Sequence, residues 1–163
     1  MVASDPIHRP DRPSSGALTA LDHAFAAARA AAVAGEVPVG AAVVRDGIVL
    51  AVAHNQPRRL NDPTAHAEIL AIRAACAVLG EERLTGCDLY VTLEPCPMCA
   101  GAISIARIRR LYYGASDPKG GGVEHGPRVF DQPTCHHVPE VYGGFREREA
   151  AALLRDFFAQ RRS

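Results

Sequence analysis

The chain has 163 residues, of which 48% are hydrophobic and 22% charged, and its 18 Lys and Arg balance its 18 Asp and Glu. This length and balance are typical of one globular domain. A net charge of zero argues against binding nucleic acid through bulk charge, although it leaves room for a local basic patch. No apolar run is long enough to span a bilayer, so we expect no membrane partner.

Residues 1–16 are rich in proline, serine and charge, and they lack the apolar segment of a secretory signal. We expect them to form a disordered N-terminal extension to a single folded domain over residues 17–163. The five cysteines are an odd number with no signal before them, which is typical of reduced thiols in the cytoplasm.

Hydrophobic spacing predicts helices and strands that alternate along the domain. A first helix ends at Gly35, and a hairpin then turns at Asp46-Gly47. Thr64 is expected to cap a second helix that ends at Gly80. The later elements are a strand over 89–93, a helix from Pro95 to about Ala106, a strand over 111–114, a short strand around 138–141, and a last helix with Ala150, Leu153, Leu154, Phe157 and Phe158 on one face. This order suggests a mixed sheet with helices on both faces, in the α/β class.

Two of the cysteines are spaced as metal ligands. Cys96 and Cys99 stand three apart at the start of a predicted helix, where partial positive charge favours thiolates, and thiolates are soft zinc ligands. A C-x-x-C pair also occurs in redox sites and in closed structural zinc sites. Cys135 with His136 or His137 could complete such a closed site, so this alternative stays open.

His66 and Glu68 point instead to a catalytic site. A neutral imidazole and two thiolates give zinc three ligands and leave its fourth position open to water. Glu68 lies on a predicted helix that is apolar nearly all round. Burying a carboxyl group there is costly, so we expect it to have a specific function or partner. It could move protons beside activated water, or it could form a salt bridge with Arg73 or another cation. The spacing H-x-E followed by P-C-x-x-C is the signature of zinc deaminases that act on cytosine or adenine.

Longer phrases around these motifs resemble the bacterial tRNA-specific adenosine deaminases, which form the wobble inosine and belong to the cytidine deaminase-like superfamily. The similar segments include residues 36–40, 61–68, 90–96 and 98–102, and the resemblance extends from about Leu18 to Arg162. The loop over residues 119–126 and the stretch over residues 135–144 depart from the family pattern.

The resemblance implies a three-layer α/β/α cytidine deaminase-like fold with a five-stranded mixed sheet, and a homodimer. It assigns one zinc ion per subunit to His66, Cys96 and Cys99, and proton transfer to Glu68. The substrate-binding residues that it implies are Asn55, Ala67, Asp117, Lys119, Arg161 and Arg162. Asn55 is placed against the base, where its amide can donate to a ring nitrogen.

The predicted function is therefore hydrolytic deamination of adenosine to inosine at the wobble position of tRNA, with zinc-activated water and a Glu68 proton shuttle. A free guanine or cytosine deaminase with the same site is the alternative. A non-catalytic zinc module is a third hypothesis, but the intact His-Ala-Glu motif argues against it. Arg161 and Arg162 could simply complement a helix dipole. The predicted dimer interface includes part of the apolar helix that carries Met98, Ala100, Ala102, Ile103 and Ile105.

Overall fold

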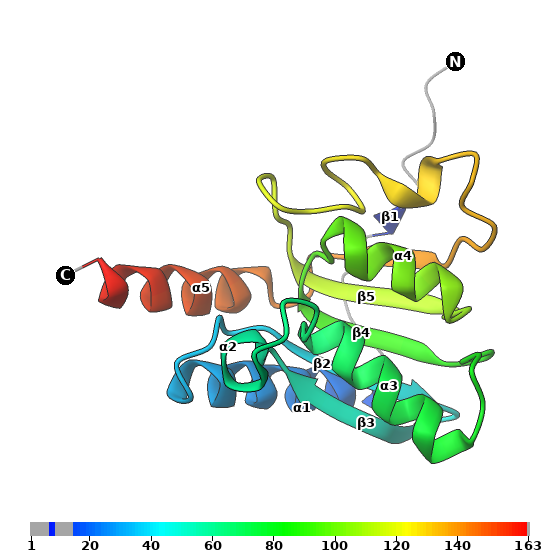
Figure 1. Cartoon of the computed structure of the whole chain (residues 1–163), viewed down its shortest axis with the longest axis horizontal. Coiled ribbons are helices and arrows are strands. Elements are labelled where there is room, and N and C mark those ends of the chain that lie inside the picture. Colours follow the sequence, from blue (N-terminus) through cyan, green and yellow to red (C-terminus); the bar gives the residue numbers. More distant parts are fainter. Residues whose placement is uncertain (1–6, 9–14, 163) are drawn as a thin grey trace.

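The computed structural model describes residues 7–8 and 15–162, and a mixed β-sheet lies at its centre (Figure 1). The sheet has six strands in the order β1-β6-β5-β4-β2-β3. The strands are β1 (Ile7–His8), β2 (Gly40–Arg45), β3 (Ile48–His54), β4 (Asp88–Leu93), β5 (Arg110–Ala115) and β6 (Glu140–Gly143). The strands β2 to β6 form the predicted five-stranded sheet, and the two residues of β1 add to its edge.

The helices are α1 (Ser15–Val33), α2 (Pro57–Leu60), α3 (Ala67–Leu79), α4 (Pro97–Ile105) and α5 (Glu147–Arg161), with a 3-10 turn η1 (Val129–Asp131). None of the helices in the described ranges is long and apolar enough to cross a membrane. Most of the segment predicted to be a disordered extension, residues 1–16, lies outside the described residues. The domain start at residue 17 therefore stays a prediction.

Two hydrophobic clusters divide the molecule into three layers. On one face of the sheet, α3 and α4 pack Ala71 and Ile103 against buried strand residues such as Leu89. On the other face, α1 and α5 pack Phe25 and Ala150 in a second cluster. Figure 1 shows α5 reaching well beyond the sheet towards the C-terminus. This arrangement is the predicted α/β/α fold.

The strand pairing explains how the sequence reaches this topology. β2 pairs antiparallel with β3 and β4, whereas β4, β5 and β6 are parallel. Asp46 and Gly47 both have positive φ, at 51° and 77°, as a two-residue hairpin turn requires. The connection from β4 through α4 to β5 is a βαβ unit, so α4 starts at the carboxyl end of β4.

Both site helices begin later than the sequence predicted. Thr64 does not cap α3, because its hydroxyl donates to Asp62 Oδ1 at 2.7 Å, and the cap position is occupied by His66. Pro95 does not open α4, because Cys96 precedes Pro97 and is extended, with φ −69° and ψ 170°. A residue before proline is disfavoured in the helical region. Both corrections place a predicted zinc ligand at a helix cap.

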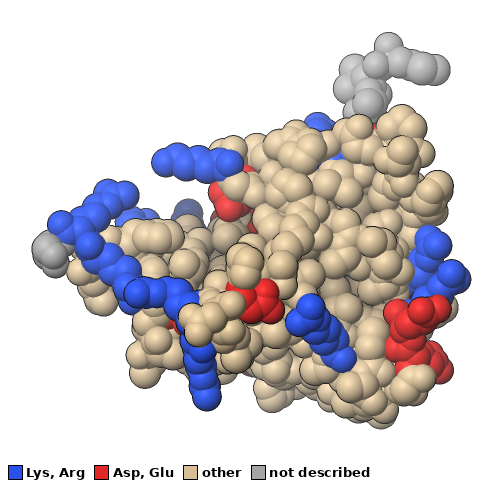
Figure 2. Space-filling view, viewed as in Figure 1, with Lys and Arg blue, Asp and Glu red and all other residues tan. Residues whose placement is uncertain are grey.

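Charge is unevenly spread over the surface. On the face shown in Figure 2, Lys and Arg side chains gather over the outer end of α5 and the elements beside it, and a broad area of the same face carries no charged group. A net charge of zero is thus compatible with the local basic patch that the sequence left open.

Candidate active site

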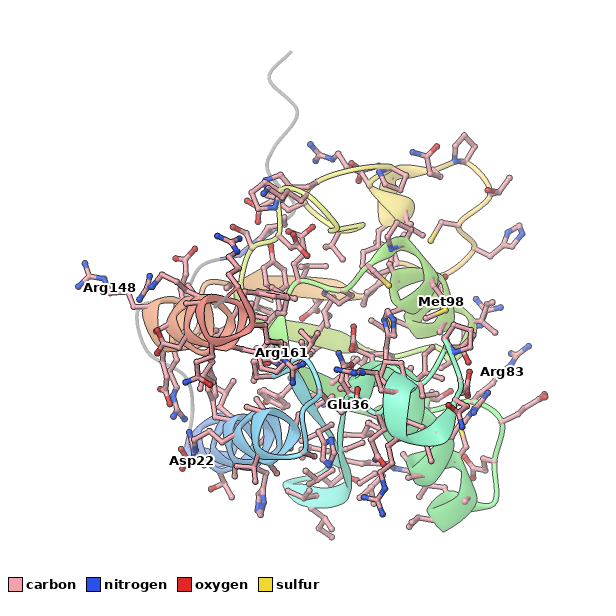
Figure 3. All side chains as sticks on the ribbon, turned by 60° about the vertical axis from the view of Figure 1, so that its left-hand side comes forward. Asp22, Glu36, Arg83, Met98, Arg148 and Arg161 are labelled. Atoms are coloured by element: carbon pink, nitrogen blue, oxygen red, sulfur yellow. The ribbon has the colours of Figure 1, made fainter. Side chains whose placement is uncertain are left out.

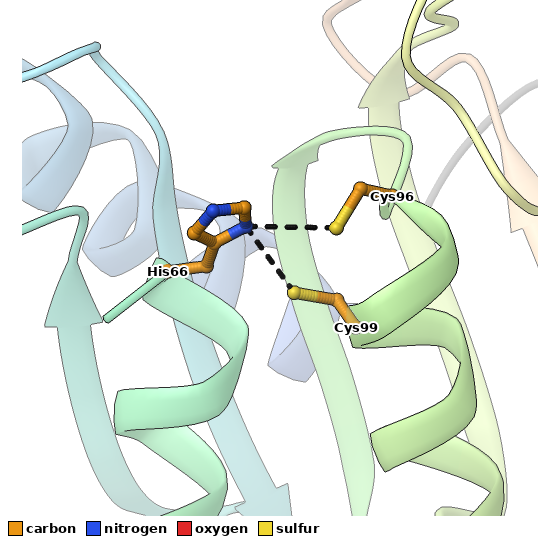
Figure 4. Close-up of side chains that lie close together, drawn as sticks. All are labelled: His66, Cys96 and Cys99. Atoms are coloured by element: carbon orange, nitrogen blue, oxygen red, sulfur yellow. Dashed lines mark hydrogen bonds between the residues drawn. The ribbon is translucent and has the colours of Figure 1, made fainter. Parts of the chain in front are cut away.

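Three ligand atoms meet where the first turns of α3 and α4 lie side by side (Figure 4). His66 Nδ1 lies 3.6 Å from Cys96 Sγ and 3.5 Å from Cys99 Sγ. His66 is the cap of α3, Cys96 is the cap of α4, and Cys99 lies in the first turn of α4. The fold therefore brings His66 next to Cys96 and Cys99, which follow it by 30 and 33 positions, near the carboxyl end of β4.

The spacing of these atoms fits zinc. Zinc binds imidazole nitrogen at about 2.0–2.1 Å and thiolate sulfur at about 2.3 Å, so tetrahedral geometry puts the nitrogen and each sulfur about 3.6 Å apart. The two observed separations, 3.6 and 3.5 Å, agree with this value. Three soft or borderline donors without a fourth are the donor set of a catalytic zinc site.

The structure argues against a closed structural site. Within the described ranges, the metal-binding group around His66 contains only Cys96 and Cys99 besides it. Cys135 Sγ is 3.3 Å from Ser104 Oγ and from the His137 carbonyl oxygen, at the far end of α4. His137 Nε2 lies 2.6 Å from the Ile108 carbonyl oxygen. Cys135 and His137 are therefore engaged elsewhere, and His136 does not belong to the group around His66.

The pKa values of the two thiols and the imidazole are shifted in different directions. Hydrogen bonds from Cys99 and His66 lower the pKa of Cys96 to about 4. The neighbouring Cys96 sulfur and burial raise the pKa of Cys99, and the bond to Cys96 raises the pKa of His66. The site thus stabilises a thiolate at Cys96 beside two groups that give up protons when a cation binds.

Glu68 lies beside this ligand set, in the first turn of α3. It is only 4% exposed, and burial raises the pKa of its carboxyl group. Among the described residues, no Lys or Arg forms an ion pair with Glu68. Arg73 is exposed, and its Nη1 lies 4.0 Å from Asp62 Oδ2. The structure therefore leaves Glu68 without that cation, in a position to exchange protons next to the ligands.

Asn55 is held rigidly against the start of α3. Its Oδ1 accepts the backbone N–H of Ala67 at 2.8 Å, and Asn55 is 8% exposed. Fixing the oxygen also fixes the direction of the amide nitrogen, because the carboxamide is planar. Ala67 is fully buried and donates its N–H to Asn55. Its predicted part in substrate binding stays a prediction.

The loop that carries Asp117 and Lys119 is folded around a residue that the sequence analysis did not single out. Glu94 is 2% exposed, and its two oxygens accept five hydrogen bonds. The donors are the backbone N–H groups of Asp117, Val123, Glu124 and His125 and the ring Nδ1 of His125, at 2.8–3.3 Å. The sequence signal that could have identified Glu94 is an acidic residue directly after a buried strand.

The glycines of this loop are required by its close packing. A Cβ atom on Gly121 would lie 2.1 Å from Glu94 Oε2, and one on Gly122 would lie 2.6 Å from Pro97 Cα. The glycine run that departs from the family pattern thus lets the loop lie on Glu94 and on the turn that carries Cys96. Asp117 Oδ1 accepts the N–H groups of Lys119 and Gly120, which fixes the tip.

A second group of side chains that could hold a metal ion consists of Glu94, directly after β4, and of Glu124 and His125 in this loop. Because the oxygens of Glu94 already accept five hydrogen bonds from the loop, they are poor candidates for a metal. We therefore assign no second metal to this group.

The predicted cations at the end of α5 lie apart from the ligand set. Arg161 donates to the Gly35 carbonyl oxygen at 3.0 Å, and its guanidinium lies 4.3 Å from the Phe157 ring centroid. Arg162 and Lys119 are exposed. Phe157 is buried as expected for a core residue, whereas Phe158 is 44% exposed. The roles of these cations in substrate binding stay predictions.

Comparisons with known proteins agree with this geometry. Residues 15–115 match the cytidine and deoxycytidylate deaminase zinc-binding region. The tRNA-specific adenosine deaminase of Agrobacterium fabrum is 62% identical over 142 residues, which cover 87% of this chain and 93% of that protein. A structure from a study of A-to-I editing by tRNA:A34 deaminases is 61% identical, with a TM-score of 0.83 over 84% of this chain and 99% of that one. A guanine deaminase from Nitrosomonas europaea is 26% identical, with a TM-score of 0.76 over 91% and 86% of the two chains.

A zinc-dependent deaminase needs three protein donors for the metal and a buried glutamate beside them. This structure places both at the adjacent N-terminal ends of two helices that pack on a mixed sheet. The match over residues 15–115 agrees with this class, and with the predicted zinc cofactor. Similarity over almost the whole length of both proteins narrows the class: the chain belongs to the family of tRNA-specific adenosine deaminases.

Proposed function

We propose that this chain is a zinc-dependent hydrolase that converts adenosine to inosine at the wobble position of a tRNA. The single observation that carries the chemistry is the buried Glu68 carboxyl beside a ligand set of one imidazole and two thiols. Family membership supports the choice of an RNA substrate, because the tRNA-specific adenosine deaminases of Agrobacterium fabrum and Rickettsia typhi are 62% and 42% identical to this chain over 87% and 88% of its length.

His66, Cys96 and Cys99 would hold the zinc ion, which when bound supplies a Lewis acid that makes water acidic enough to react near neutral pH. Glu68 takes a proton from the attacking water and gives it to N1 of the purine, while oxygen bonds to C6. Glu68 then takes the remaining proton of the new C6 hydroxyl and gives it to the amine, which leaves a carbonyl at C6. The C6–N bond breaks, ammonia leaves and inosine remains, so one water is consumed for each ammonia released.

Asn55 orients the base. With its oxygen held by Ala67, the amide nitrogen can donate to an acceptor on the purine ring. The base reaches the site from an unpaired anticodon loop, where flipping a nucleotide costs little. Substrate contacts from Asp117, Lys119, Arg161 and Arg162 belong to this proposal, as does a location in the cytoplasm with the tRNA.

The proposal includes a homodimer. On α4, Ala100 and Ile103 are buried in the core, whereas Met98 is 38% and Ile105 is 78% exposed. Ile105 lines a hollow of about 430 Å³ together with other residues of α4 and of the 129–136 segment, and the charged residues Glu82, Arg83 and Arg107 also line it. We expect a second copy to cover this apolar side. Sedimentation of the zinc-loaded protein at micromolar concentration should give a dimer, and a monomer would contradict this part.

The substrate is tested by offering the purified enzyme an ACG-anticodon tRNA, free adenosine, guanine and cytosine in separate reactions. Inosine in the tRNA and ammonia in the same reaction are expected, with little ammonia from the free compounds. Rapid ammonia release from guanine or cytosine, with the tRNA unchanged, would make the enzyme a nucleobase deaminase, as the similarity to a guanine deaminase allows.

A further inference from the structure

A hollow of about 520 Å³ lies where three segments far apart in the sequence meet. Its walls come from the turn after α1, from α2 and from the end of α5, and the residues are Ala34, Gly35, Glu36, Arg58, Arg59 and Arg161. Figure 3 shows Glu36 and Arg161 close together at this meeting point. We call this feature the arginine hollow.

The three arginines of the hollow keep their charges available. Glu36 is 2% exposed, and it accepts the backbone N–H groups of Arg58 at 3.4 Å and Arg59 at 2.8 Å. The guanidinium groups of Arg58 and Arg161 both donate to the neutral Gly35 carbonyl, at 3.5 and 3.0 Å. Among the described residues, no carboxylate forms an ion pair with any of the three guanidinium groups.

Gathering three cations around one carboxylate leaves an excess of positive charge. Like charges repel, and a concave wall concentrates their field, so such a cluster is favourable for an anion. Arginine is suited to phosphate in particular, because its planar guanidinium can donate two parallel hydrogen bonds to phosphate oxygens. The chemistry of the hollow therefore fits a phosphate group.

The hollow is tied directly to the candidate active site. Arg58 and Arg59 belong to a closed loop whose ends are Asn55 and Ala67, joined at 2.8 Å by the bond from Ala67 N–H to Asn55 Oδ1. A second bond, from the N–H of Gln56 to the Ala65 carbonyl at 3.0 Å, closes the neck of the loop. Arg58 and Arg59 therefore lie on a loop that begins and ends beside the candidate active site.

We propose that the arginine hollow binds a backbone phosphate of the substrate RNA next to the nucleotide that enters the active site. This inference rests on the proposed function and deepens it. The resemblance already placed Arg161 near tRNA, whereas Arg58 and Arg59 are new contacts. A zero net charge does not oppose it, because affinity for RNA comes from a few phosphate contacts that release counterions.

The test compares RNA binding by matched variants in a Glu68→Gln background, which prevents turnover during the measurement. Arg58→Ala/Arg59→Ala removes two guanidinium groups but keeps the backbone N–H groups that bind Glu36, so the fold should persist, as circular dichroism can check. Arg161→Ala is the third variant. Arg148→Ala is the control, since Arg148 is exposed at the opposite end of α5, away from Arg161 in Figure 3.

The probe is a labelled ACG anticodon stem-loop RNA, bound by zinc-loaded full-length protein between 50 and 200 mM salt. We expect the double variant to weaken binding roughly tenfold and to lower the slope of log Kd against log salt by about 0.7–0.9 for each lost contact. Arg148→Ala should leave the slope unchanged. In the active background, KM for the tRNA should rise while kcat at saturation stays constant.

The other outcomes separate this inference from the proposed function. If the wild type binds and deaminates the RNA but the hollow variants behave like Arg148→Ala, the inference is wrong and the function stands. If the wild type neither binds nor deaminates the RNA, the proposed function fails, and the inference with it. Titration with inorganic phosphate is the last arm. Phosphate binding that the variants lose, with RNA binding unchanged, would make the hollow a free-anion site and overturn the assignment to RNA.

Discussion

Two buried glutamates flank the candidate metal site, and their surroundings differ sharply. Glu68 and Glu94 are 4% and 2% exposed, and each lies two residues from a zinc ligand, His66 or Cys96. Glu94 accepts five hydrogen bonds that hold one loop in place. For Glu68, burial is the largest influence, and it raises the pKa of the carboxyl.

The contrast shows that burial alone does not identify a catalytic acid. A carboxylate whose oxygens are filled by N–H donors stabilises the conformation that supplies those donors. A buried carboxyl with few donors is costly to the fold, and it is retained where it can exchange protons. The hydrogen bonds of Glu94 position the loop that carries Asp117 and Lys119, whereas for Glu68 we propose a role in proton transfer.

The largest expected effect is the loss of turnover in Glu68→Gln, which should distinguish Glu68 from Glu94. Glu68→Gln keeps the shape of the side chain but cannot transfer protons, so kcat should fall by about 10²–10⁴-fold. Zinc content should stay at one per chain, and the melting temperature should stay the same or rise slightly, because an amide avoids burying an ionisable group. Metal analysis, a melting curve and tRNA deamination kinetics measure the three quantities. A Glu68→Gln enzyme with nearly full kcat would contradict the assignment.

Glu94→Gln should give the opposite pattern. The new side-chain amide places its own N–H donors opposite N–H donors of the loop, so some buried backbone N–H groups lose their acceptor. This loss should destabilise the protein by about 1–3 kcal/mol. We expect a lower melting temperature and a higher KM for tRNA, with kcat less affected than in Glu68→Gln.

The control for Glu94→Gln is zinc content, because Glu94 lies close in sequence to Cys96. Retained zinc with a higher KM would support a role in holding the loop. Loss of zinc would show instead that Glu94 supports the ligand turn, and a variant that loses kcat alone would remove the distinction between the two glutamates.

The sequence was sufficient to predict the ligand group of His66, Cys96 and Cys99 that the structure brings together. The ligands and Glu68 lie in two short segments whose internal spacing is set by local helix geometry, so the pattern could be recognised without the fold. The helix starts were less predictable. Thr64 has the chemistry of a cap, but its hydroxyl bonds to Asp62, and only the observed backbone shows that His66 occupies the cap position.

Features that depend on contacts between distant segments could not be predicted. The donors to Glu94 come from residues 23–31 positions later in the chain, which fold back over it. The arginine hollow joins Gly35, Arg58 and Arg161, and the short helix α2 that carries Arg58 has no apolar periodicity to reveal it. Such sites depend on the fold and on no local pattern.

The smallest expected effect concerns the pH dependence of the loop. His125 Nδ1–H donates to Glu94 Oε1 at 2.8 Å, and this bond, with the negative charge of Glu94, Glu124 and Asp117, raises the pKa of His125 above 6.5. The folded protein therefore binds this proton more tightly than the unfolded chain does. The resulting stability is fully present below about pH 6.5 and is lost as the pH rises through the raised pKa.

His125→Gln tests this effect, because glutamine keeps a neutral N–H donor and removes the titratable charge. We expect the wild type to melt at a higher temperature than the variant near pH 5.5, and the difference to shrink towards pH 8.5. The shift should be small, since the His125 side chain is 31% exposed and water screens its ion pair. Measuring both zinc-loaded proteins at each pH cancels the titration of other groups. A difference in melting temperature that stays constant across this range would mean that His125 holds Glu94 through a neutral hydrogen bond, and that the loop carries no pH-dependent ion pair.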